Sequence, residues 1–186
     1  MTFTATNFPG LCIVEPLIFE DERGFFYESY NAKIFQNNKI TTEFVQDNQS
    51  FSHYGVIRGL HYQLEPYAQS KLVRVLQGRM LDVVVDIRKG SPTYGQSLSI
   101  ELCAENKKQL FIPKGFAHGF AVLSETADIL YKCDNFYNKE SEAGIIYNDA
   151  VLNIDWQVLS NKIIASSKDL QLPIFKECKN NFEFRG

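Results

Sequence analysis

The chain has 186 residues, of which 45% are hydrophobic and 22% are charged, the ordinary composition of a globular protein with a sizeable core. Its formal net charge of -3 provides no general basic field, which argues against nucleic-acid binding. A local cluster of Arg and Lys side chains could still hold an anionic ligand.

The opening residues, the apolar runs and the cysteines indicate the cellular compartment that the sequence predicts. The opening residues, MTFTATNFPG, have neither a basic start nor an apolar stretch, so no signal peptide is expected. No run approaches the roughly 18 apolar residues that a membrane span needs. The four cysteines are scattered without a CxxC pair, which favours reduced thiols in a cytoplasmic protein over a disulfide framework or a zinc site.

Short strand-like runs separated by turn residues dominate the first third of the chain. An apolar run over 11–19 precedes a turn at 21–24 and the aromatic residues 25–27. A helix is predicted over 31–39, with Asn31 as its N-cap and with Ile34 and Phe35 on its apolar side.

The stretch 44–63, FVQDNQSFSHYGVIRGLHYQ, combines polar side chains with strand-like runs, as in one wall of a pocket. Arg58 and His61 are three residues apart, so a regular strand would point them to opposite faces. A bulge at Gly59 would let both side chains face inward.

The segment 71–87 reads as a β-hairpin with its turn at Gly78. An even-length turn would place Val73 opposite Asp82, with Lys71 and Asp82 on one face of the same sheet. An odd-length loop would break this pairing.

Further strands are predicted over 96–103, 116–123 and 127–133, with turns or breaks at 90–92, 105–109 and 111–115. After residue 149 the pattern loosens into turns and short helices. No repeat or linker is visible, so residues 1–186 are expected to form one domain. Eight to eleven short strands with little helix indicate an all-β antiparallel sandwich or barrel, and we favour a jelly roll whose open mouth holds a small ligand.

A lone histidine such as His61 is more often a packed barrel residue than a catalyst. Its significance here comes from Lys71, Asp82, His118 and Tyr131, which fall on strands that could converge. Imidazole, with an ordinary pKa of about 6.5, can take a proton from a carbon beside a carbonyl. A tyrosine can return a proton to the opposite face, and a lysine ammonium can stabilise the enolate between the two steps.

Metal binding is the competing interpretation for a jelly roll with histidines. Metal-binding cupins present two histidines one residue apart with a glutamate nearby, whereas here Gln63 follows His61 by two residues and Gly119-Phe120 follows His118. With three histidines and no close pair, a bound metal is not expected.

The chain resembles one family over nearly its whole length, from about residue 11 to 173. The motifs that carry the resemblance are DERGFFYESY (21–30), FVQDNQS (44–50), VIRGLHYQ (56–63), KLVRVLQGRMLDVVVDIRKGSPTYG (71–95), IPKGFAHGF (112–120), YKCDNFYNKESE (131–142), YND (147–149), IDW (154–156) and SKD (167–169). In this order they are similar to the dTDP-4-dehydrorhamnose 3,5-epimerases, the RmlC type of cupin.

The resemblance implies a metal-free, cofactor-free jelly-roll homodimer acting on a nucleotide sugar. Its substrate would be dTDP-4-dehydro-6-deoxy-D-glucose, inverted at C3 and C5 to dTDP-4-dehydro-L-rhamnose. Both carbons flank the C4 ketone, so their hydrogens are acidic enough for an imidazole to remove.

The catalytic residues that the resemblance implies are four. His61 matches the general base, and Asp169 matches the carboxylate that orients it. Lys71 matches the group that stabilises the enolate at the C4 oxygen, and Tyr131 matches the general acid.

The resemblance also implies a wider binding surface. Asp82 and His118 match residues that support the catalytic groups or form the pocket wall, and Arg58 matches a residue that contacts phosphate. The remaining substrate-binding positions, some of them contributed by a partner subunit, are Arg23, Phe26, Glu28, Gln46 and Asn48 for the nucleotide, and Tyr137 and Glu142 in less defined roles.

Four positions depart from the family's pattern: Asp134, Ala150, Gln157 and Ala165. None is a proposed catalytic group, but they bear on the conformation near Asp169 and on whether one or both carbons are inverted. The motifs do not separate the double epimerase from a single-position epimerase on a related 4-keto sugar. A non-catalytic sugar-nucleotide-binding barrel is the alternative from a different class.

Overall fold

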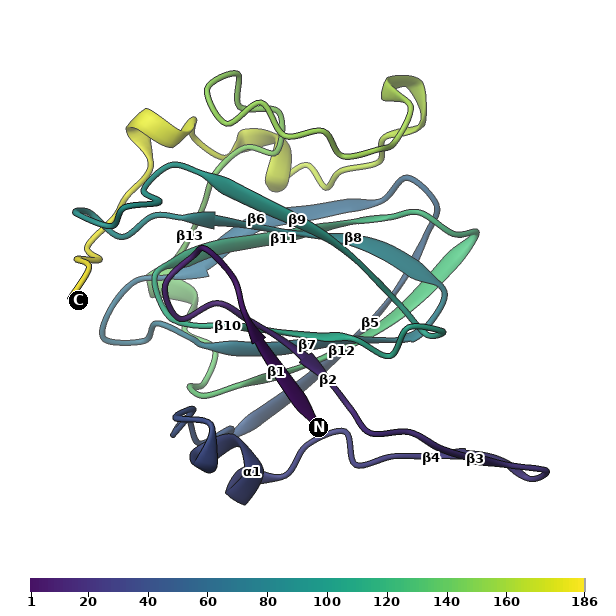
Figure 1. Ribbon diagram of the computed structural model, residues 1–186. Coiled ribbons are helices and arrows are strands. Elements are labelled where there is room, and N and C mark those ends of the chain that lie inside the picture. Colours follow the sequence, from purple (N-terminus) through teal and green to yellow (C-terminus); the bar gives the residue numbers. More distant parts are fainter. Residues whose placement is uncertain (186) are drawn as a thin grey trace.

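The computed structural model describes residues 1–185 and consists mainly of two antiparallel β-sheets packed face to face (Figure 1). One sheet has six strands in the order β1-β2-β10-β7-β12-β5, and the other has five in the order β13-β6-β11-β8-β9. This is the jelly-roll arrangement expected from the sequence. Among the described residues, no helix is long and apolar enough to cross a membrane.

The six-stranded sheet comprises β1 (Thr2–Ala5), β2 (Cys12–Glu15), β5 (Gln46–His53), β7 (Lys71–Gln77), β10 (Gln109–Ile112) and β12 (Thr126–Cys133). The five-stranded sheet comprises β6 (Ile57–Gln63), β8 (Arg79–Asp86), β9 (Ser97–Cys103), β11 (Phe116–Val122) and β13 (Glu142–Gly144). A separate hairpin is formed by β3 (Phe19–Asp21) and β4 (Gly24–Phe26). The helical elements are α1 (Ala32–Asn37), η1 (Lys139–Ser141), η2 (Ser160–Lys162), η3 (Asp169–Gln171) and η4 (Phe175–Glu177).

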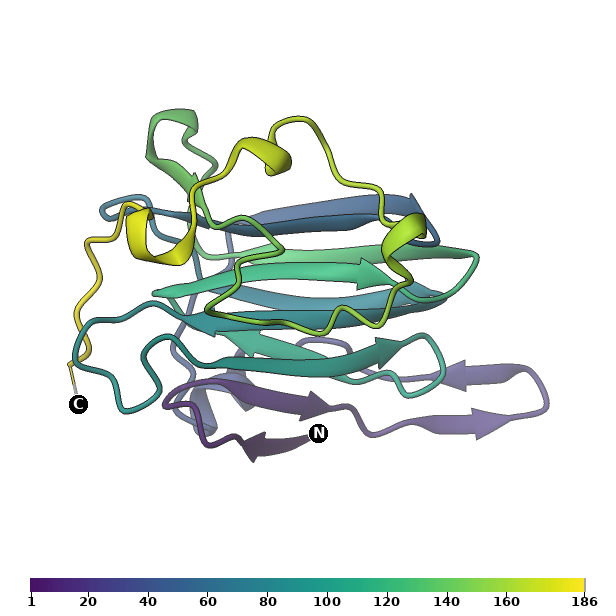
Figure 2. The ribbon, with the colours of Figure 1, turned by 90° about the horizontal axis from the view of Figure 1, so that it is seen from above.

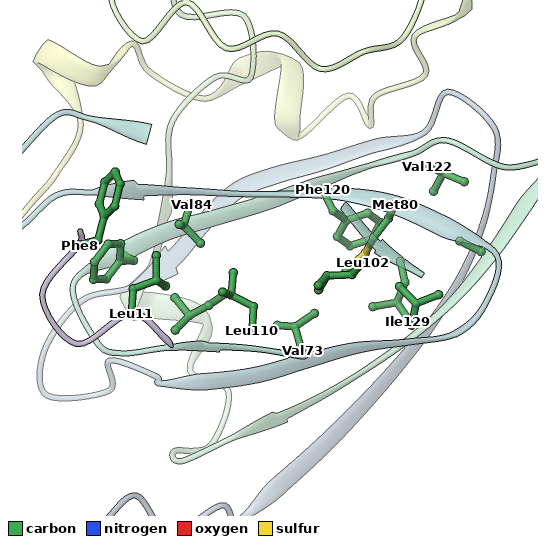
Figure 3. Close-up of a cluster of buried hydrophobic side chains, with 14 residues drawn as sticks. Phe8, Leu11, Val73, Met80, Val84, Leu102, Leu110, Phe120, Val122 and Ile129 are labelled. Carbon is green, nitrogen blue, oxygen red and sulfur yellow. The ribbon is translucent and has the colours of Figure 1, made fainter. Parts of the chain in front are cut away.

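The main core fills the space between the two sheets (Figure 3). Val73 and Ile129 point into it from the six-stranded sheet, and Met80, Val84 and Phe120 meet them from the five-stranded sheet. These side chains alternate with residues on the opposite face of each strand, as the period of two requires. Their burial supplies the main driving force for closing the sandwich.

A second core covers the outer face of the five-stranded sheet. The chain from about residue 146 onward crosses that face in turns and short helices (Figure 2). Leu152, Trp156 and Phe182 pack there against Leu81 and Val83 of β8. The loose C-terminal pattern is therefore an ordered covering layer, and the predicted short helices are present as η2, η3 and η4.

The first helix agrees with its prediction. Asn31 caps α1 by accepting hydrogen bonds from the backbone N–H groups of Lys33 and Ile34. Phe35 is buried and packs with Leu72 and Phe111 against the outer face of the six-stranded sheet. The turn at 21–24 is also present and joins β3 to β4.

The predicted hairpin over 71–87 is wrong. β7 pairs with β10 and β12, whereas β8 pairs with β11 and β9, so the two strands belong to different sheets. Gly78, with φ +79°, carries the chain from one sheet to the other. Lys71 and Asp82 consequently lie in opposite sheets and do not share one face of a single sheet. The sequence pattern also missed β10 as a strand.

Candidate active site

A cavity of about 530 Å³ lies between the sheets and is closed on one side by the C-terminal segment. Six of the predicted site residues line it: Arg58, His61, Lys71, His118, Tyr131 and Asp169. They come from β6, β7, β11, β12 and the short helix η3. The fold thus brings together groups that are up to 111 residues apart in sequence, from position 58 to position 169.

His61 is held by a carboxylate. Its Nε2 lies 2.6 Å from Oδ1 of Asp169, which is buried. Burial alone would raise the pKa of Asp169, but the hydrogen bond and charge of His61, with the Gly59 N–H and the Ser166 hydroxyl, lower it overall. An ionised carboxylate on Nε2 fixes the ring's tautomer and leaves Nδ1 to accept a proton.

Arg58 and His61 both face the cavity because β6 is irregular between them. His118 of β11 pairs with His61, while Phe120 pairs with Arg58, so β6 has one extra residue in this interval. This is the bulge predicted at Gly59. A Cβ at Gly59 would lie 2.6 Å from the Cα of Gly119, so only glycine allows the two strands to approach this closely.

A second imidazole–carboxylate pair lies beside the first. His118 Nε2 is 2.5 Å from Oδ1 of Asp82, which is fully buried between the sheets. His118 lines the cavity, whereas Asp82 lies behind it.

Lys71 and Tyr131 face the histidines from the other sheet. The Nζ atom of Lys71 lies 5.8 Å from the centre of the Tyr131 ring. Burial raises the pKa of Tyr131, so its hydroxyl remains a proton donor, and burial lowers the pKa of Lys71. A flat molecule between the sheets would have an imidazole on one face and a phenol on the other.

A smaller cavity of about 180 Å³ adjoins the first and shares His61, Lys71 and Tyr131 with it. Four more predicted residues line this smaller cavity: Gln46, Asn48, Tyr137 and Glu142. Gln46 donates to Asn48 Oδ1 (3.0 Å) and accepts a hydrogen bond from the Tyr137 backbone N–H (3.1 Å). The Tyr137 hydroxyl donates to Glu142 Oε2 over 2.9 Å.

Arg23, Phe26 and Glu28 lie away from both cavities of their own chain. Arg23 and Phe26 belong to the β3–β4 hairpin, which projects from the barrel (Figure 1). Arg23 pairs with Asp21, Phe26 is 68% exposed, and Glu28 accepts a hydrogen bond from the Asn31 side chain. Within one chain the structure does not bring these residues to the site.

Sequence reasoning missed several lining residues. Lys168 lines the large cavity and forms an ion pair with Glu142 (2.6 Å), although it stands directly before Asp169 in the SKD motif. Ser50 also lines the cavity, and Ser52 accepts a hydrogen bond from Arg58 Nε (3.2 Å). The alternation of β5 from Gln46 and Asn48 onward could have identified both serines.

No group of three or more His, Cys, Asp or Glu side chains within residues 1–185 is placed to hold a metal ion. The predicted absence of a metal stays a prediction, which metal analysis of the purified protein can check.

Comparison with known proteins gives a consistent result. The family model described as dTDP-4-dehydrorhamnose 3,5-epimerase matches residues 5–177. The chain is 53% identical over 182 residues to the curated dTDP-4-dehydrorhamnose 3,5-epimerase of Shigella flexneri, covering 94% of this chain and 99% of the relative.

Solved structures agree with this result. A crystal structure of RmlC from Legionella pneumophila Philadelphia 1 in complex with dTDP-4-keto-L-rhamnose aligns with a TM-score of 0.95 and 47% identity, covering 100% of this chain and 99% of that one. A 3'-monoepimerase from Streptomyces bikiniensis, ChmJ, in complex with dTDP-quinovose aligns with a TM-score of 0.84 and 29% identity, covering 91% and 85%.

Proposed function

Because the chain belongs to the dTDP-4-dehydrorhamnose 3,5-epimerase family, we propose that it inverts C3 and C5 of dTDP-4-dehydro-6-deoxy-D-glucose to give dTDP-4-dehydro-L-rhamnose. The observation that carries this proposal is the placement of His61 and Tyr131 on opposite sheets across one cavity. Inversion of a carbon requires a proton to leave one face and another to reach the opposite face.

The proposed reaction begins at His61. Its Nδ1 removes the hydrogen from a carbon beside the C4 ketone, and the Asp169 carboxylate stabilises the imidazolium that forms. The electron pair moves onto the C4 oxygen, where the Lys71 ammonium stabilises the enolate. Tyr131 then protonates the carbon from the other face, and exchange with water removes the proton from His61 and returns one to Tyr131. Only protons are transferred, so the proposed reaction needs no cofactor.

The nucleotide is proposed to extend from the sugar through the cavity mouth. Arg58 is held by Ser52 at the edge of the large cavity, where its guanidinium can bind the diphosphate. Gln46, Asn48, Tyr137 and Glu142 form the wall of the adjoining cavity and supply amide, phenol and carboxylate groups for the sugar and the base.

We further propose a homodimer in which each hairpin completes the partner's site. Arg23 and Phe26 are exposed and remote from their own cavity, so a second copy is where their guanidinium and aromatic ring would meet the nucleotide. A cytoplasmic location is proposed on the scattered cysteines, which fit a reducing compartment.

Deuterium incorporation from D₂O tests the proposed reaction directly. The substrate is incubated with the enzyme in D₂O, and label at C3 and at C5 is measured by NMR and mass spectrometry. Label at both carbons is expected. Label at C3 alone would support the single-position epimerase, an activity named for the Streptomyces bikiniensis relative. Binding of dTDP without any exchange would instead support a non-catalytic barrel.

A further inference from the structure

The Asp169 carboxylate, which holds the proposed base, belongs to a segment outside both sheets. This segment, residues 162–172, lies beside β6 in turns and contains η3 (Figure 2). Five of its residues line the large cavity: Ile164, Ala165, Ser166, Lys168 and Asp169. Because the carboxylate comes from this segment, the way the segment is held against the barrel decides how the imidazole of His61 is held.

The N-terminal end of segment 162–172 rests on Gly55. The Ile164 N–H donates to the Gly55 carbonyl, and the Ile164 carbonyl accepts from the Ile57 N–H, each over 2.9 Å. Gly55 has φ +82°, and a Cβ at this position would overlap the carbonyl oxygen of Lys162. Only glycine therefore lets the backbone of Lys162 approach this closely.

The C-terminal end of the segment rests on a second glycine. The two methyl groups of Leu172 lie over Gly144 of β13, where a Cβ would be 2.8 Å and 2.9 Å from them. Gly144 is the residue of β13 that pairs directly with His61 of β6. The packing of Leu172 thus reaches the strand position next to the proposed base.

Hydrogen bonds make the chain between the two glycine contacts a compact turn. The Asp169 N–H donates to Ser166 Oγ, and the Leu170 N–H donates to the Ser166 carbonyl, both over 3.0 Å. The ion pair of Lys168 with Glu142 (2.6 Å) adds a third contact, but the Lys168 side chain is 62% exposed, so this pair stabilises the segment little. A shift at either glycine contact would therefore move Asp169 with the turn.

We propose that Gly55 and Gly144 are positioning residues for the base: they let both ends of segment 162–172 lie close to the sheet, which keeps Asp169 Oδ1 2.6 Å from His61 Nε2. This role rests on the proposed function, because it takes His61 as the base. A side chain at either glycine would lift one end of the segment off the sheet. A misplacement of about 1 Å can cost about 10²-fold in rate, so these remote contacts would affect catalysis.

The test observes the His61 ring by NMR in the free protein. The chain has three histidines, so ¹⁵N-labelled histidine gives a simple spectrum, and the His61 signals are assigned by their loss in His61→Ala. In the unmodified protein the proton of the neutral ring should reside on Nε2, which donates to Asp169. In Gly55→Ala this preference should weaken, kcat should fall by about 10²-fold, and dTDP binding should change little.

Two controls separate positioning from general destabilisation. Gly90→Ala introduces an alanine at the similar φ of +83°, but no atom lies within 4 Å of its Cβ, so the His61 signals and kcat should not change. In the spectrum of Gly55→Ala itself, the His118 signals should stay unchanged, because its partner Asp82 belongs to β8. A Gly55→Ala protein that unfolds more easily but keeps the His61 signals and the kcat of Gly90→Ala would overturn the proposal.

If Gly55→Ala does not fold, removing a side chain tests the other contact. Leu172→Ala deletes the methyl groups over Gly144 and should also weaken the preference of the His61 proton for Nε2. Leu170→Ala is the matched control, because Leu170 lies two residues earlier and is 52% exposed, so the same truncation should leave the His61 signals unchanged. Equal spectra for the two variants would overturn the proposal. These spectra need no substrate, so their result is independent of the deuterium experiment on the epimerase activity.

Discussion

At the scale of single residues, the site depends on how His61 is held. One ring nitrogen is tied to Asp169, and the strand bulge at Gly59 turns the ring toward the cavity. The other wall supplies Tyr131, whose hydroxyl stays protonated because it is buried. The proposed base and the proposed acid thus lie on opposite sheets across one cavity.

Replacing His61 by Ala should abolish proton exchange at both carbons. General-base assistance is worth about 10²–10⁴-fold, so exchange is expected to fall by at least that range. Binding of dTDP, measured by calorimetry, should change little because the imidazole is proposed to act on the sugar and not on the nucleotide. Exchange at a rate comparable with the unmodified enzyme would show that the base is misassigned.

Replacing Tyr131 by Phe removes one hydroxyl from the opposite wall. Completed inversion, chiefly at C5, should fall by about 10²-fold or more, whereas His61 can still remove a proton. NMR should therefore show deuterium exchange with retained configuration exceeding product formation. Equal turnover in the two proteins would exclude Tyr131 as the acid.

At the scale of elements, the connection from β7 to β8 decides which sheet each strand joins. Gly78 has φ +79°, and a Cβ there would lie 2.0 Å from the carbonyl oxygen of Thr126. The chain can therefore turn sharply from one sheet into the other only with glycine. This corner places Lys71 and Asp82 in opposite sheets.

Gly78→Ala is expected to lower the free energy of unfolding by more than the roughly 1–2 kcal/mol cost of a left-handed alanine. Gly90→Ala is the matched control, because Gly90 has φ +83° but no atom within 4 Å of a Cβ. Urea unfolding of both variants measures the difference. Equal losses would show that the close contact with Thr126 contributes nothing.

The end of β8 carries a buried ion pair that anchors the following turn. Asp86 accepts hydrogen bonds from Arg88 Nη2 (2.7 Å), Ser91 Oγ (2.6 Å) and Thr93 Oγ1 (2.7 Å). Burial alone would raise the pKa of Asp86, but these donors lower it overall. A lowered pKa means that the stabilisation is complete above the unfolded value of about 3.9 and is lost as pH falls through the folded value.

Asp86→Asn should therefore destabilise the protein by up to about 3–5 kcal/mol near pH 7, since it leaves the mostly buried Arg88 without its anion. The difference from the unmodified protein should shrink as the pH falls below about 4, where Asp86 becomes protonated. Denaturant unfolding at a series of pH values checks this. A difference that stays constant with pH would contradict the assignment.

At the scale of the whole molecule, the large cavity is lined by the proposed catalytic groups, which come from both sheets and the C-terminal layer. The hairpin residues Arg23 and Phe26 do not line it. Phe26 is 68% exposed, and the hairpin projects beyond the barrel (Figure 2). A large exposed aromatic beside Arg23 is suited to an intermolecular contact.

Mixing two inactive variants tests whether sites are shared between copies. His61→Ala and the double variant Arg23→Ala/Phe26→Ala should each be inactive alone. After subunit exchange, each heterodimer would contain one intact site, so about a quarter of normal activity should return if the subunits mix statistically. Sedimentation of each protein provides the control for dimer formation. No recovery from dimers that do exchange would place the hairpin outside the partner's site.

The sequence by itself determined the strand alternation, the Asn31 cap and the bulge at Gly59, because these depend on local geometry and residue type. Its resemblance to a family identified ten of the residues that line the two cavities. Only the tertiary structure decided that β7 and β8 belong to opposite sheets, that β10 is a strand, and that Lys168 and Ser50 reach the site. An inward-facing strand shows the same alternation whether the next strand pairs beside it or packs across the core. The pairing of all the strands in the sandwich determines which of those two arrangements forms.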